Sequence, residues 1–195
     1  WSLLTEPEAF SRLATARLAG LIGAAICGIA IYDRETRSMI PSLPVFGLDD
    51  ELARGFRYTV EPHHKSLWSF ASGRAYVSNH PRSDPRLIQG LVQLCDLQTI
   101  VLVPMLAEGQ VLGVIAAANK PGGFGDNDVQ LLSTFAGAAG AILRGRQVFE
   151  AQRRHAARLE RLSALAGEMA AARGRAKLVD LATTRIQSDL GFTRV

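Results

Sequence analysis

The sequence predicts an α+β protein with an antiparallel β-sheet flanked by helices and followed by a long C-terminal helix. Two apolar runs, residues 99–106 and 110–118, are joined by a short turn and indicate a β-hairpin. A helical pattern begins at Asp126 and continues to about Gly167, which is too long for an ordinary domain helix. Before the hairpin, one helical segment and two strand-like segments are followed by an irregular stretch.

Composition supports one folded domain with an appendage. The 195 residues leave roughly 40 to 50 beyond a domain of ordinary size. The net charge of +4 arises largely in one arginine-rich stretch. Cys27 and Cys95 lie in apolar runs, far apart, so they predict neither a disulfide framework nor a metal site, and a reducing cytoplasm fits them best. No apolar run reaches the roughly 20 residues that a membrane span needs.

The first elements follow from hydrophobic periodicity. Residues 7–21 are predicted as an amphipathic helix, with Leu13, Leu18 and Leu21 among its apolar positions. Residues 26–32 are apolar on both faces and predict a buried central strand that ends in a turn over 33–36. Residues 39–45 predict a second strand, placed at a sheet edge or before a loop because prolines interrupt it.

The segment 47–90 is the least regular part. Residues 65–72 can form a helix that ends at Gly73, and 75–78 can form a short strand. Asp84 and Pro85 suit the N-cap and first turn of a helix that runs through Leu94.

The long helix changes character along its length. Beyond about residue 148 its apolar positions thin to a 3-4 spacing, which is typical of a coiled-coil seam and requires a partner helix. The predicted dimer positions are Phe135, Ile142, Phe149, Leu159, Leu162 and Met169. Arginines flank this seam without interleaved aromatic residues, so they are interpreted as solvated coiled-coil positions and no nucleic-acid partner is predicted.

A second domain is expected to begin after the long helix. Residues 178–186 have one apolar face, and Gly191 precedes a strand-like end, which repeats the order seen at the start of the chain. The predicted organisation is therefore a first domain over 1–147, a coiled-coil-like linker helix over 148–173, and the truncated start of a second domain over 174–195.

Several residues after the hairpin sharpen this architecture. Val103, Pro104 and Met105 precede the turn at 108–110, and Leu112, Gly113 and Val114 follow it. Asn119, Lys120, Phe124 and Asp128 then resemble the Asn-Lys-Phe-Asp-Glu signature of GAF domains, with Val129 in place of the final glutamate. The resemblance to the GAF family covers about residues 8–147 and implies a GAF/PAS-like fold. Lys120 is expected to pair with Asp128, and Phe124 to fill the loop between them.

The resemblance also bears on ligands. The bilin-binding relatives carry a chromophore cysteine on the helix before the hairpin, where this chain has residues 87–90, so no bilin is expected. Binding of a cyclic nucleotide is an option that the residues do not establish. GAF-fold free methionine sulfoxide reductases use several cysteines around the pocket, whereas Cys27 and Cys95 give no resolving pair.

A small molecule would be expected between the sheet and the irregular segment, where loops bring polar groups over an apolar floor. The predicted ligand-binding residues are Phe46, His63, His64, Trp68, Tyr76, Asn79 and Arg82. Adjacent His63 and His64 point apart and lack a third ligand at a useful spacing, so no metal is predicted. No set of nucleophile, base and orienting acid is recognisable, so no catalytic residues and no enzyme are predicted.

The resulting hypothesis is a cytoplasmic, non-catalytic sensory module of bacterial-type signal transduction, such as a regulator of a histidine kinase or of cyclic-dinucleotide signalling. It would bind a small molecule and act through a homodimeric exit helix on an effector domain in the same polypeptide. The alternatives are a structural dimerisation module without a ligand and, third, a methionine sulfoxide reductase.

Overall fold

A computed structural model of the chain describes residues 7–59, 72–171, 179 and 181–186. It divides into two compact units, Trp1–Arg144 and Gly145–Val195, which meet within one helix. Residues 65–71 of the predicted helix over 65–72 and most of the predicted second domain lie outside the described residues, so these two predictions stay untested. Among the described helices, none has the length and apolar character required to cross a bilayer.

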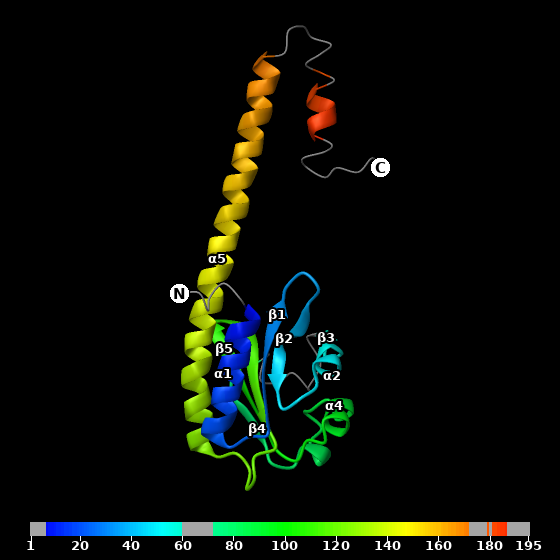
Figure 1. The fold of residues 1–195 in the computed structure, drawn as a ribbon, viewed down its shortest axis with the longest axis vertical. Helices are drawn as coiled ribbons and strands as arrows, with labels where there is room; N and C mark the ends of the chain where they lie inside the picture. Colours follow the sequence, from blue (N-terminus) through cyan, green and yellow to red (C-terminus); the bar gives the residue numbers. More distant parts are fainter. Residues whose placement is uncertain (1–6, 60–71, 172–178, 180, 187–195) are drawn as a thin grey trace. The chain divides into compact units, whose positions relative to one another are not determined.

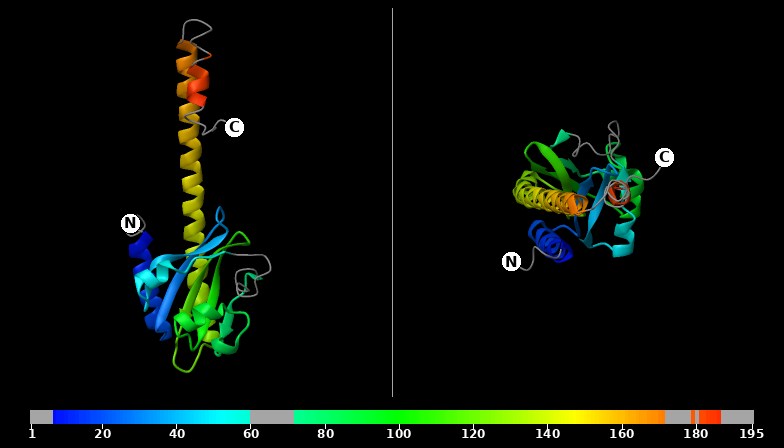
Figure 2. Two further views of the ribbon diagram at one scale, coloured as in Figure 1. Left: turned by 90° about the vertical axis from the view of Figure 1, so that its right-hand side faces the viewer. Right: turned by 90° about the horizontal axis from the view of Figure 1, so that it is seen from above.

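The first unit is built on one antiparallel sheet in the order β3-β2-β1-β6-β5-β4, which confirms the predicted α+β class. The strands are β1 (Ile26–Asp33), β2 (Ser38–Phe46), β3 (Tyr58–Thr59), β4 (Tyr76–Ser78), β5 (Ile100–Ala107) and β6 (Gln110–Ala118). Helices α1 (Pro7–Ile22) and the first part of α5 (Asp126–Ala171) cover one face, while the short α2 (Asp50–Arg54) and α4 (Gln89–Leu94) lie on the other (Figures 1 and 2).

The predicted hairpin is present as β5 and β6, with Ala107 opposite Gln110. Glu108 and Gly109 form the turn between them, with φ of 51° and 75°. Positive φ at both central residues is the type I′ geometry that matches the twist of a two-residue hairpin. The turn sets the pairing of Ala107 and Leu106 with Gln110 and Val111, and a register shift between Leu106 and Met105 then sets the pairing of the remaining residues, which begins with Met105 opposite Gly113.

The strand predictions need one adjustment. β1 is central, between β2 and β6, and its closing turn is held by Asp33, whose carboxylate accepts from the Glu35 N–H and the Thr36 hydroxyl. β2 is not itself the last strand, because β3 pairs beside it at Ser38 and Met39. That pairing ends before the two prolines of β2, where the missing N–H groups would interrupt a longer ladder.

The buried face of α1 differs from the prediction. Leu18, Ala19 and Ile22 are buried, whereas Leu13 and Leu21 are 47% and 63% exposed. Two polar residues complete the buried face, because the Ser11 hydroxyl donates to the Ser42 carbonyl and the Thr15 hydroxyl donates to the Ser11 carbonyl. Polar side chains that find such partners can be buried at little cost, which hydrophobic periodicity does not register.

The predicted helix over 85–94 is shorter than expected. A 3-10 turn, η3 (Pro81–Ser83), precedes it, and α4 begins only at Gln89. Asp84 does not cap a helix there, because its carboxylate accepts from the Arg86 N–H in a local turn and also from the Tyr76 hydroxyl. The Gln89 side chain donates to the Asp84 carbonyl over 2.7 Å and holds this loop closed.

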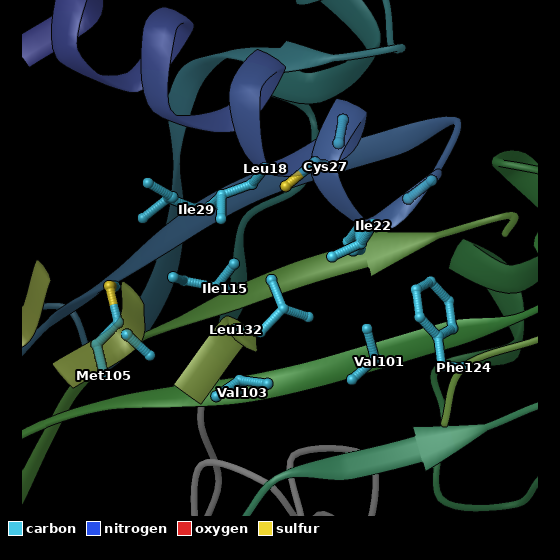
Figure 3. Close-up of a cluster of buried hydrophobic side chains, with 14 residues drawn as sticks. Leu18, Ile22, Cys27, Ile29, Val101, Val103, Met105, Ile115, Phe124 and Leu132 are labelled. Carbon is cyan, nitrogen blue, oxygen red and sulfur yellow. The ribbon is translucent and has the colours of Figure 1, made fainter. Parts of the chain in front are cut away.

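The main hydrophobic core lies between the sheet and the α1/α5 layer. Leu132 of α5 is fully buried and points toward the strands, as Figure 3 shows. It shares one cluster with the buried side chains of Leu18, Ile22, Cys27, Ile29, Val101, Val103, Met105, Ile115, Phe124 and Ala136. Gly140 brings the α5 backbone against the hairpin, since a Cβ there would lie 2.6 Å from the Leu106 carbonyl oxygen.

Candidate functional site

The other face of the sheet holds a cavity of about 200 Å³. Its floor comes from β1, β2, β5 and β6, and its walls come from the segment after β2 and from the α4 region. The floor side chains include Ile26, Gly28, Ala30, Met39, Val45, Ile100, Leu102, Val114, Ala116 and Ala118. The walls include Leu48, Phe56, Tyr58, Leu87, Ile88, Leu91, Val92, Cys95 and Leu97.

The middle of the sheet carries small side chains on this face, and the Val45 side chain occupies the position beside Gly28, where a Cβ would lie 3.0 Å from Val45 Cγ1. Gly28 of β1 lies opposite Ala116 of β6, and Ala30 lies two residues further along β1. Alternate strand residues face opposite sides, so the larger Ile115 and Cys27 fill the helix face of the same strands. A sheet with these residues is packed on one side and hollow on the other.

Two of the lining residues have polar side chains, Tyr58 and Cys95. Burial and, to a smaller extent, the neighbouring Cys95 side chain raise the pKa of Tyr58 to about 12. Burial also raises the pKa of the Cys95 thiol. At neutral pH both groups are therefore protonated and uncharged, so they can offer hydrogen bonds but no counter-charge.

The structure does not gather the predicted ligand residues at this cavity. Phe46 is 41% exposed at the end of β2, and the exposed Arg82 forms an ion pair with Asp96. Asn79 is tied to the backbone of Phe124, whose N–H donates to the Asn79 side chain over 2.9 Å. None of these is among the described lining residues. His63, His64 and Trp68 lie outside the described part of the chain.

Tyr76 occupies a separate position beside a shallow, open depression. Its hydroxyl donates to Asp84, and burial together with this bond raises the pKa of Tyr76. Burial alone would raise the pKa of Asp84, but hydrogen bonds from Tyr76, Ser78 and the Arg86 N–H outweigh it and hold that pKa below its ordinary value. This cluster fastens a loop and leaves no free group for a ligand.

The signature residues after the hairpin adopt the predicted arrangement. Lys120 Nζ donates to both carboxylate oxygens of Asp128 at 2.7 Å, and Phe124 is 5% exposed between them. Asn119 lies in the left-handed region with φ of 57°, and its side chain accepts from the Gln98 N–H and donates to the Asp96 carbonyl. All four residues stabilise the connection from β6 to α5.

The two cysteines are separated by the sheet. Cys27 is fully buried in the core against α1, and burial raises the pKa of its thiol to about 12. Cys95 ends α4 on the cavity side. Both are free thiols. Within the described ranges, no group of three His, Cys, Asp or Glu side chains is arranged to hold a metal ion.

The predicted dimer positions on α5 are largely open to solvent. Phe135, Ile142 and Phe149 repeat every seven residues and are 41%, 45% and 58% exposed. Leu159 follows ten residues after Phe149, at the second apolar position of the same heptad register, and is 53% exposed. Leu162 is also exposed, and Met169 is partly covered.

A central antiparallel sheet with a packed helical layer on one face and a cavity on the other defines a class of α+β domains. Residues 5–144 match the family model of the GAF domain. The chain belongs to the GAF domain family, as the signature residues indicated.

Solved structures support the same fold at low sequence identity. A GAF domain/HD domain protein from Geobacter sulfurreducens is 20% identical, with 75% of this chain and 97% of that chain covered and a TM-score of 0.63. A domain of a putative two-component sensor histidine kinase protein from Sinorhizobium meliloti 1021 is 15% identical, with coverages of 76% and 97% and a TM-score of 0.59.

Free methionine-R-sulfoxide reductase from Neisseria meningitidis, solved with its substrate, is also similar. It is 21% identical, with 79% of this chain and 86% of that chain covered and a TM-score of 0.57. No curated protein matches this chain. At these identities the similarity concerns the fold alone.

Proposed function

We propose that this chain is a non-catalytic sensory module that binds a small molecule in the cavity and relays its state through α5. The observation that carries the proposal is the division of one sheet into a hollow face and a packed face that holds α1 and α5. Strands β1, β5 and β6 contribute to both faces, so a ligand on one side contacts the elements against which α5 is packed. A ligand-dependent shift in these strands would change the packing of α5.

The similar structures favour a signalling context. One belongs to a protein with a GAF domain and an HD domain, and another to a sensor histidine kinase. Both place this fold beside an effector in a larger polypeptide. We propose the same arrangement here, with a downstream effector domain in the same chain and a cytoplasmic location that suits two free thiols.

The cysteine geometry argues against reductase chemistry. A dithiol mechanism requires one thiolate to attack and a second thiol to resolve the intermediate. Cys27 and Cys95 pack on opposite faces of the sheet, and burial raises the pKa of both thiols. Assay of free methionine sulfoxide reduction tests this directly. Activity that disappears when both cysteines are replaced would establish an enzyme instead.

The relay is proposed to require a second copy of α5. Exposed apolar residues at heptad spacing are costly in water and are buried when two such helices pair. We therefore expect a homodimer in which Phe135, Ile142, Phe149 and Leu159 face their counterparts.

Sedimentation of the wild type and two variants tests the dimer. Leu159→Asp and Leu162→Asp are expected to shift the protein from dimer toward monomer by at least tenfold in dissociation constant. Ala164→Asp is the matched control, because Ala164 is exposed on α5 away from the seam. A wild-type monomer, or equal effects of Leu159→Asp and Ala164→Asp, would contradict the relay.

The second candidate is a structural dimerisation module whose cavity receives no ligand. The exposed apolar residues on α5 support a structural dimerisation module as well as they support a sensor. Native mass spectrometry of the purified protein separates the two, since a co-purified small molecule supports the sensor. Thermal shifts with added metabolites extend the test, because a ligand that binds only the folded state raises the melting temperature.

A further inference from the structure

The described lining of the cavity contains no charged side chain, which restricts the charge of a suitable ligand. A carboxylate, phosphate or ammonium group that entered the cavity would lose its hydration without gaining a charged partner from the described lining residues, which is unfavourable. The backbone of the floor gives no compensation. Gly28 and Ala30 lie in register with Ala116 and Val114, so their backbone groups belong to the β1–β6 ladder.

The volume of the cavity suits a small molecule. Pockets for drug-sized compounds enclose about 300 to 1,000 Å³, whereas this cavity encloses about 200 Å³. An apolar protein cavity of about 150 Å³ is large enough for benzene. The site is therefore suited to one ring or two fused rings, and a nucleotide with its sugar and phosphate exceeds it.

The wall supplies an aromatic face and, in Tyr58, a hydroxyl that is a stronger hydrogen-bond donor than the Cys95 thiol. The rings of Phe56 and Tyr58 lie 6.5 Å apart between centroids. Aromatic rings at such separations gain stabilisation beyond area burial, so a third ring would be favoured beside them. The Tyr58 hydroxyl makes no hydrogen bond to another described residue, which leaves it available to a single polar group on the ligand.

We propose that the cavity between the sheet and α4 binds a small, uncharged aromatic molecule with at most one hydrogen-bonding group, which pairs with the Tyr58 hydroxyl. This inference rests on the proposed function and adds the ligand class. It disfavours cyclic nucleotides and zwitterionic amino acids, both of which bring charges that the described lining does not meet.

Binding of indole and phenol, measured by isothermal titration and by thermal shift at pH 7, tests the ligand class. Benzoate and cyclic GMP are the charged comparison compounds. Indole or phenol is expected to bind and to raise the melting temperature, and benzoate is expected to bind at least about 100-fold more weakly. Lowering the pH to protonate benzoate should recover part of its affinity.

Two variants place the binding in this cavity. Ala116→Leu fills the floor and is expected to abolish binding, whereas Ala151→Leu makes the same change on the exposed surface of α5 and should leave binding unchanged. Tyr58→Phe keeps the ring and removes the hydroxyl, so it is expected to weaken phenol binding about threefold to tenfold. The melting temperature of each variant without ligand verifies that it folds.

The outcomes separate this inference from the proposed function. If benzoate or cyclic GMP binds the wild type and Ala116→Leu abolishes that binding, the sensor role stands and the uncharged ligand class is overturned. If no compound binds and no molecule co-purifies with the protein, the ligand class and the ligand-binding role are both overturned. Binding of indole that survives Ala116→Leu would overturn the assignment to this cavity.

Discussion

The two faces of the sheet use the same strands for opposite purposes. On the α1/α5 face, alternate residues such as Val103, Met105 and Ile115 are large and almost fully buried. On the other face, the small side chains of Ala30, Ala116 and Ala118 line a space that α2 and α4 do not fill. Successive side chains of a strand point to opposite faces of the sheet. One strand can therefore place large residues in the core and small residues at the cavity.

Truncation of a leucine on each face gives the largest expected contrast. Leu132→Ala removes a fully buried side chain from the packed face and should cost about 3–4 kcal/mol of unfolding free energy. Leu91→Ala makes the same change beside the existing cavity, where Leu91 is partly exposed, and should cost about 1 kcal/mol. Urea denaturation measures both. Equal losses would show that the second face is as closely packed as the first.

Enlargement of neighbouring alanines in β6 sharpens the same comparison. Ala117→Leu adds three carbons to the packed core and should lower the unfolding free energy by about 1–3 kcal/mol, because the buried side chains around Ala117 would have to shift. Ala116→Leu points into the cavity and should change the unfolding free energy by less than about 1 kcal/mol. A larger loss for Ala116→Leu than for Ala117→Leu would reverse the assignment of the two faces.

A change in the Lys120–Asp128 pair, which closes the end of the packed face, should have a smaller effect than truncation of Leu132. Asp128→Asn weakens the hydrogen bonds from Lys120 and the Gly125 N–H and should cost about 1–2 kcal/mol at neutral pH. Asp126→Asn, an exposed change in the same helical turn, should be nearly neutral.

The cost of Asp128→Asn should depend on pH. Burial alone would raise the pKa of Asp128, but hydrogen bonds from Lys120 and Gly125 outweigh it and hold the pKa below its ordinary value of 3.8. A carboxyl with a lowered folded-state pKa stabilises the fold above its unfolded-state pKa, and this contribution is lost as the pH falls through the folded-state value. Thermal melts of wild type and variant should therefore converge below about pH 3.8. A constant difference would contradict the ion pair.

The sequence predicted the sheet and the long helix because their signals are local. The hairpin is predicted by two apolar runs on either side of Glu108 and Gly109. The helix α5 is predicted by apolar residues that repeat at helical spacing without a break. The Lys120–Asp128 pair was also predictable, since both residues belong to one short signature. These features require only the order of residues over a dozen positions or fewer, or a single repeating pattern.

The cavity could not be predicted in the same way. It depends on Ala30 of β1 and Ala116 of β6 lying on the same face of strands that are far apart in sequence, and therefore on strand register. The alternation of small and large residues in β1 was an available signal, but the polar residues of the irregular segment suggested a different site. Asn79 and Arg82 are polar because they hold loops, and only their hydrogen-bond partners distinguish that role from ligand binding.

The glycine at position 140 has a mechanical consequence. With no side chain between the α5 backbone and the Leu106 carbonyl, the helix rests directly on the end of the hairpin strand. In the proposed relay, a tilt of the hairpin would act directly on the α5 backbone at this point, because no side chain lies between them. The contact would then be the pivot of the helix, about midway along the sequence between the buried Leu132 and the exposed Phe149.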